Sequence, residues 1–360
     1  MEQAIKIKVP GKLMVAGEFA VLEKHHPLIV MAVDRFVETT IEKTPISRVC
    51  LPDVEVPSAT WDFLKKRVHI HHSSRRMSFV NDAMSYTLRY LKEQNIEIEP
   101  FTITVHSELD DKKTGVKFGL GSSAAVVTSV VRAILQLFLG DKVTDELVFK
   151  LASISHVKTQ GNGSGADIAA STYGGVLLYT SFQAEWLLSQ FRKTRSITEL
   201  IEKDWKYLSI KQLKFPPSIQ LAVGWTGKAA STKSLVKEVK KMDDRSVYEA
   251  FLVKSKTAVL LMIEGMETEN VAKFLKGIEQ NRIALAEMGN IAKVPIETEK
   301  LRKLRDEAVK LGGAGKLSGA GGGDCGIAFL PLDKDVDELY GAWEQLNIKP
   351  LTINVYERAE

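Results

Sequence analysis

One stretch of the chain, "GVKFGLGSSAAVVTSVVRAILQLF" at residues 115–138, constrains its fold more than any other. Glycines at 119 and 121 precede two serines and two alanines, and an apolar segment with helical spacing follows. Glycine allows positive φ angles and leaves no Cβ in the way of a close ligand. A helix that begins here offers unpaired backbone N–H groups to an anion, and phosphate suits such a site. We therefore expect a phosphate-binding turn followed by a helix that ends near Gly140.

The glycine-rich segments also match three competing patterns. An isolated "GSS" is typical of an ordinary serine N-cap. "GLGSSA" matches the dinucleotide-binding pattern with Asp141 about 20 residues further on, but "DDKKTGVKF" separates it from any strand and "LQLFLGD" is typical of a helix end. "GGAGKLSG" nearly matches a nucleotide-binding P-loop, but Leu317 stands where Ser or Thr must hold magnesium. We interpret the dinucleotide match as a coincidence and reject the P-loop interpretation.

Length and composition indicate a soluble two-domain protein. The chain has 360 residues, which is long for one domain, and its 44% hydrophobic and 26% charged residues are typical of a soluble globular protein. A net charge of +4 fits anionic metabolites but is too diluted for a nucleic-acid partner. The start has no signal-peptide pattern, and we expect no apolar run of membrane-spanning length. Cys50 and Cys325 are far apart, as expected of reduced thiols in a cytoplasmic protein without a membrane anchor.

The order of predicted elements indicates an α+β fold in two domains. Helices are expected at 78–95 and 145–160, among strands of the N-terminal half. The pattern loosens over 182–217, and "KFPPS" resembles a linker. Long amphipathic helices and the segment "GAGKLSGAGGGDCGIAFL" follow. We place the domains at 1–181 and 218–360, with 182–217 connecting them.

A second glycine-rich turn, "GNGSGADIAAS", supplies the chemistry. Asp167 is its only ionisable residue. Such an aspartate often only caps a helix, but beside a bound phosphate donor it would orient an acceptor oxygen and take its proton. Lys12, in "PGKLMVAGE", offers a balancing cation that lowers the pKa of the carboxylate and binds a phosphoryl group. Glu18 fits a structural role better than a catalytic one.

In this order, "VPGKLMVAGEFAVL", "GLGSSAAVV" and "LSGAGGGDCGIAF" resemble the GHMP kinases, named for galacto-, homoserine, mevalonate and phosphomevalonate kinases. The likeness extends over essentially the whole chain. It implies an N-terminal ribosomal-protein-like α/β domain that carries the ATP phosphate loop, and a C-terminal ferredoxin-like domain that closes over it.

Within the family, the bacterial phosphomevalonate kinases are most similar in four further segments, "AVDRFVETTIE", "SELDDKKTGVKFGLGSSAAV", "GWTGKAAST" and "IKPLTINVY". This likeness implies transfer of the γ-phosphoryl group of ATP to the 5-phosphate of phosphomevalonate, which gives diphosphomevalonate in the mevalonate route to isoprenoids. Another small-molecule kinase of the family, such as a mevalonate kinase, is the alternative.

The resemblance also implies roles for individual residues. Asp167 matches the catalytic aspartate and Lys12 its paired lysine, and both would contact the substrate. The third motif and Ser164 would lie beside the substrate. In mevalonate kinases a glutamate eleven residues before the aspartate helps to hold magnesium, whereas His156 stands here, so the second metal ligand stays open. The phosphate loop comprises Gly119, Leu120, Gly121, Ser122, Ser123 and Ala124, with Ser122 or Ser123 on Mg²⁺, and the third motif comprises Ser318, Gly319 and Ala320.

An acceptor with a carboxylate and a phosphate needs further cations. Lys117, Arg35 and Lys228 are candidates beside Lys12, and Lys117 ranks first because it directly precedes the phosphate loop, although a solvated loop lysine is equally typical there. The histidines of "HIHHSSRR" have no acidic or Cys partner nearby in the sequence and fit an exposed edge strand and loop better than a metal site.

Two other function classes stay open. One is a ligand-sensing relative without turnover, which the presence of both Lys12 and Asp167 disfavours. The other is an oxidoreductase built on "GLGSSA". The residues that bind adenine and the oligomeric state cannot be derived from the sequence.

Overall fold

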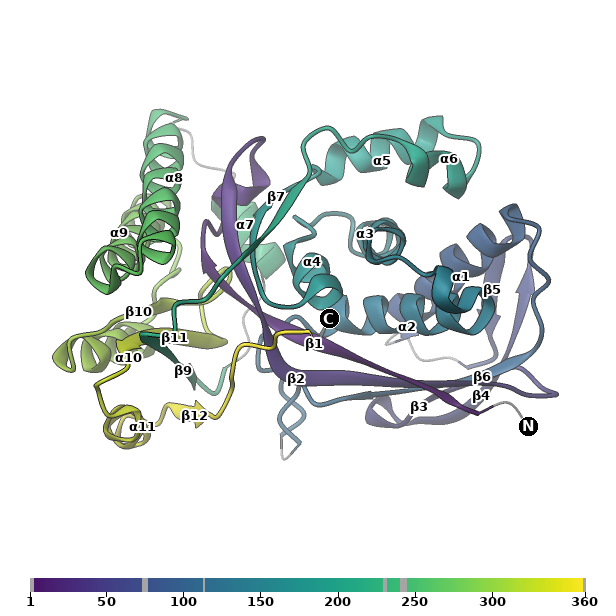
Figure 1. Ribbon diagram of the computed structural model, residues 1–360, viewed down its shortest axis with the longest axis horizontal. Helices are drawn as coiled ribbons and strands as arrows, with labels where there is room; N and C mark the ends of the chain where they lie inside the picture. The colour runs from purple at the N-terminus through teal and green to yellow at the C-terminus, as the bar shows by residue number, and fades with distance from the viewer. Residues whose placement is uncertain (1–2, 73–76, 113, 229–231, 240–244, 359–360) are drawn as a thin grey trace.

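Two β-sheets, each with its own helices, form the two halves of the molecule (Figure 1). The structure, a computed structural model, describes residues 3–72, 77–112, 114–228, 232–239 and 245–358. Residues 73–76 of "HIHHSSRR" and 229–231 of "GWTGKAAST" lie outside the described residues. The mixture of helices and strands in two sheets confirms the predicted α+β class.

The first sheet runs in the order β5-β4-β3-β6-β2-β7-β8, with β1 paired to β2. Its strand pairs are antiparallel except β3 with β6. β1 and β2 are long and mostly buried, and they run through the centre of the molecule between the two halves (Figure 1). The strands are β1 (Ile5–Ala16), β2 (Pro27–Lys43), β3 (Arg48–Leu51), β4 (Val56–Leu64), β5 (Arg67–Ile70), β6 (Phe101–Ser107), β7 (Val176–Thr180) and β8 (Ser209–Leu213).

The helix that follows the glycine turn, α2 (Ser122–Leu139), lies in the middle of this half. It contacts β1 and β2 as well as α1 (Ser78–Glu93), α3 (Asp145–Gln160) and α4 (Ala166–Tyr173). The segment 122–142 is long and apolar enough to cross a membrane by length and composition, so the expectation that no run reaches this length is wrong. Its apolar side chains are needed because the helix is surrounded by protein: Val127, Val130 and Ile134 are fully buried.

The segment expected to connect the domains, 182–217, contains α5 (Ala184–Lys193), α6 (Ile197–Glu202) and β8. β8 pairs with β7 and so extends the first sheet, with Tyr179 opposite Ile210. The chain then passes to the second sheet over residues 214–218.

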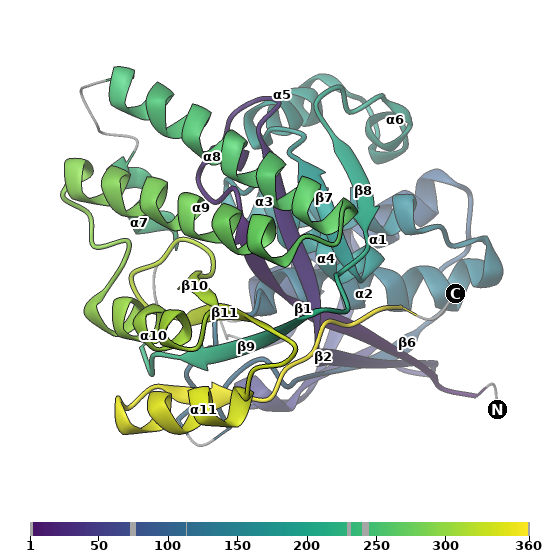
Figure 2. The same ribbon diagram turned by 60° about the vertical axis from the view of Figure 1, so that its left-hand side comes forward.

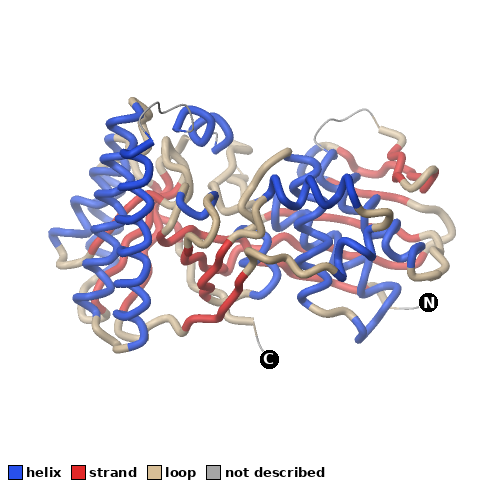
Figure 3. The backbone as a smooth tube through the Cα atoms, turned by 90° about the horizontal axis from the view of Figure 1, so that it is seen from above, coloured by secondary structure: helices blue, strands red, loops and turns tan. Residues whose placement is uncertain are grey.

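The second sheet is antiparallel, in the order β10-β11-β9-β12. Two long helices, α8 and α9, lie side by side at its end of the molecule (Figure 2). Figure 3 shows the two halves from above, each with its own group of helices. The elements are α7 (Thr232–Val239), α8 (Arg245–Glu267), α9 (Val271–Ala292), α10 (Glu299–Lys310) and α11 (Val336–Gln345), with β9 (Ile219–Trp225), β10 (Ala314–Leu317), β11 (Cys325–Pro331) and β12 (Lys349–Leu351).

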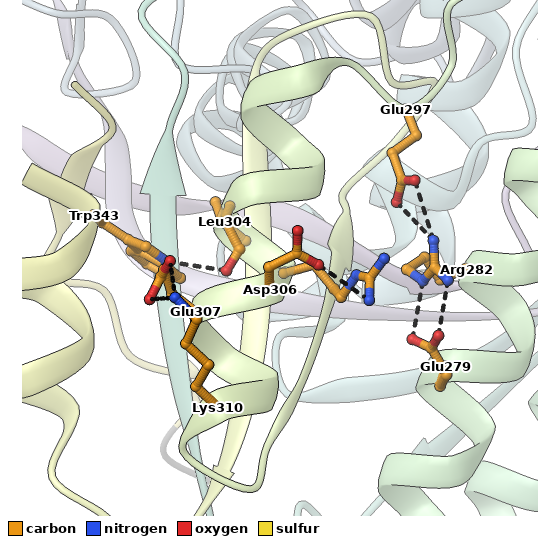
Figure 4. A network of polar contacts seen from close by, with 9 residues as sticks. Glu279, Arg282, Glu297, Leu304, Asp306, Glu307, Lys310 and Trp343 are labelled. Carbon is orange, nitrogen blue, oxygen red and sulfur yellow. Dashed lines mark hydrogen bonds and ion pairs between the residues drawn. The ribbon is translucent and has the colours of Figure 1, made fainter. Parts of the chain in front are cut away.

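Polar contacts fix the helices of the second half (Figure 4). The guanidinium of Arg282 on α9 binds both Glu279 on the same helix and Glu297 just before α10, at 2.8 and 3.1 Å. The indole N–H of Trp343 on α11 donates to the carbonyl of Leu304 on α10 at 3.0 Å. These contacts hold α10 between α9 and α11. They thereby fix the position of β10, which follows α10, and of the glycine-rich segment after β10.

After β12 the chain returns to the first sheet. Val355 forms a β-bridge with Val33, and the N–H of Tyr356 donates to Ala32 at 2.9 Å. The chain thus joins the two halves twice. Residues 214–218 lead from β8 into the second sheet, and the segment after β12 returns to β2.

Candidate active site

The turn before α2 presents bare amides to one side. Gly119 and Gly121 have φ angles of 87° and 80°. Gly121 is the N-cap of α2, and no side chain caps the helix there. The first bond within the helix runs from the N–H of Ala125 to the carbonyl of Gly121 at 3.1 Å, so the N–H groups of residues 122–124 have no partner within the helix. With no acidic residue in the first turn, the positive end of α2 is suited to an anion.

Lys12 on β1 lies directly against this turn. Its ammonium donates to the carbonyl of Gly119 at 3.0 Å, and its backbone N–H donates to Leu120 at 2.8 Å. A Cβ on Gly121 would stand 3.0 Å from Cγ of Lys12, so position 121 requires glycine for space as well as for φ. Lys12 is 8% exposed, and no carboxylate of the described residues lies within ion-pair distance of it. A buried ammonium with only a carbonyl partner is well suited to take up an anion.

Asp167 lies in the first turn of α4, where one carboxylate oxygen accepts from the N–H of Ile168 at 3.0 Å. Ser171, four residues later and so on the same face, donates to the carbonyl of Pro10 on β1 at 2.8 Å. This contact places α4 against β1, two residues before Lys12 along that strand, and Asp167 and Lys12 form no ion pair with each other. The half-buried carboxylate of Asp167 acts through its charge on His156, which contacts Ser123, and its catalytic role stays a prediction.

His156 on α3 joins the two glycine-rich turns. Its Nε2 lies 3.1 Å from the hydroxyl of Ser123, and its ring stacks on Phe79 with centroids 5.2 Å apart. Burial lowers the pKa of His156, although the charge of Asp167 acts in the opposite direction. A neutral imidazole fills the position where a carboxylate was considered, so this position offers no oxygen to Mg²⁺.

The described residues contain no group of three His, Cys, Asp or Glu side chains that would hold a metal alone. The turn nevertheless offers the hydroxyls of Ser122 and Ser123 as oxygen donors, and Asp167 at the start of α4 is the candidate carboxylate. This set fits Mg²⁺ that takes its remaining ligands from nucleotide phosphates and water.

The third motif is attached to β1. The Ser318 hydroxyl accepts from the N–H of Met14 at 2.9 Å and donates to its carbonyl at 3.0 Å. Both hydrogen bonds of this hydroxyl therefore link the two sheets, which leaves it unavailable to a ligand. The space beside Gly319 is open, because a Cβ there would meet nothing within 4 Å. Ala320 packs on an apolar cluster of the second half. Only the backbone of residues 318–320 is left to face a ligand.

Asp324 was not found from the sequence. A Cβ on Gly119 would stand 2.6 Å from Cγ of Asp324, which places this carboxylate directly on the phosphate turn. The backbone N–H of Asp324 donates to the carbonyl of Lys228 at 2.7 Å, while the Lys228 side chain is exposed. The sequence nevertheless holds a signal for Asp324. Like Asp167, it is the one charged residue in a glycine-rich segment, here "LSGAGGGDCGIAFL".

The other candidate cations differ in their surroundings. Lys117 is exposed and pairs through its backbone with Asp110, directly before the turn. Arg35 donates to the carbonyl of Thr352 at 2.7 Å and so holds the returning tail. Ser164 is half-buried, and its carbonyl accepts from the Tyr179 hydroxyl at 2.6 Å.

The rejected motifs are rejected by the structure as well. Lys316 of "GGAGKLSG" lies in β10, fully buried, and its ammonium binds the Glu18 carboxylate, which confirms a structural role for Glu18. Asp141 is exposed after α2. The histidines form no metal site among the described residues: His69 is exposed on the edge strand β5, and exposed His71 pairs with Asp62 at 2.8 Å.

Comparison with known proteins agrees with this geometry. Residues 78–175 match the family described as GHMP kinases N terminal domain, and residues 262–349 match GHMP kinases C terminal. The chain belongs to the GHMP kinase family, whose members are ATP-dependent kinases.

Individual relatives are more specific. A phosphomevalonate kinase from Streptomyces sp. (strain CL190) is 31% identical over 98% of this chain and 97% of its own. The structure of Streptococcus pneumoniae phosphomevalonate kinase in complex with phosphomevalonate and AMPPNP superposes with a TM-score of 0.85 at 28% identity, covering 98% of this chain and 100% of that chain. A mevalonate kinase from Pyrococcus furiosus is 26% identical over 89% of this chain and 88% of its own.

Proposed function

We propose that this protein is a phosphomevalonate kinase, which transfers the γ-phosphoryl group of ATP to the phosphate of phosphomevalonate. The observation that carries the proposal is Lys12, a buried ammonium without a carboxylate partner among the described residues, held against the bare amides that open α2. Ordinary folding gives no reason to leave such a cation without an anion. The relatives of matching length support the choice of acceptor.

The reaction asks the protein mainly for alignment and charge neutralisation. An oxygen of the acceptor phosphate attacks the γ-phosphorus, the bond from that phosphorus to the bridging oxygen breaks, and ADP leaves with the electron pair. The N–H groups of residues 122–124 and the ammonium of Lys12 bind the oxygens on which charge develops. The acceptor phosphate is largely ionised near neutral pH, because its second pKa is about 6. Asp167 therefore orients the acceptor, whereas the Gly119 carbonyl positions Lys12.

Asp167 and the hydroxyls of Ser122 or Ser123 would hold Mg²⁺, which would supply positive charge to the phosphate oxygens. The hydrogen bond between His156 and Ser123 fixes the direction of one of these hydroxyls. A rotating hydroxyl would bind less well, because its orientation would have to be ordered at each turnover.

We assign the adenine base to a cavity of about 290 Å³ between β5 and the start of α1. Two lining residues, Ser78 and Asn81, flank Phe79 along α1, and Phe79 stacks on His156, which contacts Ser123. The buried side-chain oxygen of Asn81 has no hydrogen-bond partner among the described residues. An amide beside apolar side chains matches a flat base with donors and acceptors on its edge. The cavity is lined by Val68, His69, Ile70, His72, Met77, Ser78 and Asn81.

A coupled ADP-release assay tests the proposal, with mevalonate, phosphomevalonate and diphosphomevalonate as separate acceptors. We expect the highest kcat/KM with phosphomevalonate. Equal or higher kcat/KM with mevalonate would identify a mevalonate kinase instead, and no acceptor-dependent release would favour a ligand-sensing protein. Stabilisation by ATP without stabilisation by NADH would discard the oxidoreductase alternative.

A further inference from the structure

A second cavity lies in the first half, and no residue of the phosphate turn lines it. It has a volume of about 240 Å³ and lies among the β4–β5 hairpin, α1, the end of α3 and α5. It shares no residue with the adenine cavity or the candidate active site. Its lining consists of Lys65, Lys66, Arg67, Asp82, Ser85, Tyr86, Arg89, Lys158 and Phe191.

Positive charge dominates this lining, because five cations face one carboxylate. That carboxylate, Asp82, accepts a hydrogen bond from the Thr159 hydroxyl at 2.8 Å. Among the cations only Arg89 has an ion-pair partner in the described residues, Glu93 at 2.9 Å. The cavity therefore carries a clear excess of positive charge.

The two lysines occupy a turn whose backbone does not favour them. Leu64 and Arg67 are paired across the hairpin, so Lys65 and Lys66 form a two-residue turn. Their φ angles are 50° and 67°. Turns with two positive φ angles strongly prefer Asn and Gly, and other residues there are strained. The turn thus holds two adjacent ammonium groups at the mouth of the cavity at a conformational cost.

The rest of the cavity is rigid and offers further donors. Lys158 is held over the ring of Phe191, 4.3 Å from its centroid, and Tyr86 packs edge-on against the same ring at 5.7 Å. Burial raises the pKa of Tyr86, so its hydroxyl stays protonated and able to donate. Asp82 and Thr159 tie α1 to α3 below the cavity.

From this arrangement we infer that the cavity binds the diphosphate group of a small metabolite, at a site separate from that of ATP. Several ammonium groups and a guanidinium around a cavity of this size match an anion with more than one charge and two adjacent phosphate groups. A single carboxylate would leave most of these cations unpaired, and a whole nucleotide exceeds the available volume. The inference does not depend on the identity of the acceptor in the kinase reaction.

Isothermal titration calorimetry with inorganic diphosphate tests this site in two crossed variants. The double variant Lys65→Asn and Lys66→Gly removes two cations and installs residues that the turn prefers, so its melting temperature should equal or exceed that of the wild type. Its diphosphate affinity should fall at least about tenfold, the loss expected for one charge-assisted hydrogen bond. Lys12→Met, which alters the phosphate turn, should retain the same diphosphate binding.

Lys92→Gln is the matched control, since Lys92 is exposed on α1 and does not line the cavity. It should bind diphosphate as the wild type does. Lys158→Gln removes a different cation of the cavity and should also lower the diphosphate affinity. Binding that is lost in Lys12→Met but kept in the double variant would put diphosphate in the phosphate turn and overturn the inference. Absence of saturable binding in the wild type, or an equal loss in Lys92→Gln, would overturn it too.

Further arms with diphosphomevalonate and ADP distinguish the sources of the diphosphate. Diphosphomevalonate binding that is weakened in the double variant supports the site and identifies the metabolite class. ADP, which as a whole nucleotide exceeds the cavity volume, should bind the double variant as it binds the wild type, and a weaker affinity would contradict the volume argument. Binding of inorganic diphosphate alone would assign the site to the free anion.

Discussion

At the scale of single residues, we propose that two side chains carry the chemistry. Lys12 is buried against the phosphate turn, and Asp167 lies in the first turn of α4. Neither is used to stabilise the fold through an ion pair among the described residues. In this respect they differ from charged side chains such as Glu18 and Lys316, whose ion pair explains why they are buried.

Asp167→Asn should lower kcat by roughly 10²–10⁴-fold, because the variant keeps the shape of the side chain but loses its charge. The melting temperature should change little, since the hydrogen bond from Ile168 can still be accepted. Steady-state ADP release and a thermal melt measure both. Near-normal kcat in a folded variant would remove Asp167 from the catalytic group.

At the scale of elements, the turn and α2 together form the proposed anion site. Gly121 contributes to this site in two ways. Its φ angle of 80° favours glycine, and the lack of a Cβ leaves space for the side chain of Lys12. The space that a Cβ would occupy is decisive here, because both the stem of Lys12 and the approaching anion need it.

Gly121→Ala should weaken binding of the ATP analogue AMPPNP, measured by calorimetry, at least about tenfold, together with a stability loss of about 1–3 kcal/mol from backbone strain. Gly140→Ala is the control at the other end of α2. Gly140 also has a positive φ, 56°, but a Cβ there would meet nothing within 4 Å. It should lose stability without losing affinity; equal affinity losses in the two variants would show that the effect is indirect.

Much of this element structure can be predicted from the sequence, because it follows from local patterns. The helical spacing after Gly121 and the glycine stop at 140 predict α2 almost to its bounds. The sequence predicts Asp167 because it is the only charged residue of a small-residue turn, and Lys12 because it supplies the cation of the motif "PGKLMVAGE". Such local rules depend only on neighbours along the chain.

What the sequence could not show is which segments meet. The joint between Ser318 and Met14 spans 304 positions, and no local pattern predicts it. Asp324 on Gly119 and His156 on Ser123 are contacts of the same kind. α2 was misjudged for a related reason: its apolar composition matches a membrane span, and only its burial among other elements explains it.

At the scale of the whole molecule, a buried ion pair joins the two halves. Lys316 on β10 and Glu18 after β1 are 0% and 2% exposed, and the Lys316 ammonium also donates to the Leu317 carbonyl at 2.7 Å. Two residues after Lys316, the hydrogen bonds between Ser318 and Met14 form a second link between the halves. The third glycine-rich motif is thereby fixed to the strand that carries Lys12.

Glu18→Gln or Lys316→Met alone should destabilise the protein by about 3–5 kcal/mol, because each leaves a buried charge without its partner. The double variant should recover much of this loss, since no unpaired charge remains. Chemical denaturation of the four proteins gives the coupling free energy. Additive losses would show that the two side chains do not stabilise each other.

The C-terminal tail is held at its end by a second charge cluster. Asp145 at the start of α3 binds Arg132 at 2.5 Å and Arg358 of the tail at 2.7 Å. Burial acts to raise the pKa of Asp145, but the two guanidinium groups outweigh it and hold the pKa below its usual 3.8. A carboxylate with a lowered pKa in the folded state stabilises the protein above pH 3.8, and this contribution is lost as the pH falls through the folded value.

Asp145→Asn should therefore have a lower melting temperature than the wild type at pH 6, and the gap should close as the pH falls below about 3.8. Melting curves between pH 6 and the lowest pH at which both proteins fold measure this gap. A gap that stays constant over the range would mean that the charge of Asp145 does not contribute.

The central claim is that this chain builds a new phosphorus–oxygen–phosphorus bond on an acceptor that already carries a phosphate. Phosphorus NMR of a reaction mixture with ATP, Mg²⁺ and phosphomevalonate detects this bond directly. We predict that the monoester signal of the acceptor disappears and that two coupled diphosphate signals replace it as ADP forms. Release of free inorganic phosphate with an unchanged acceptor signal would contradict the claim.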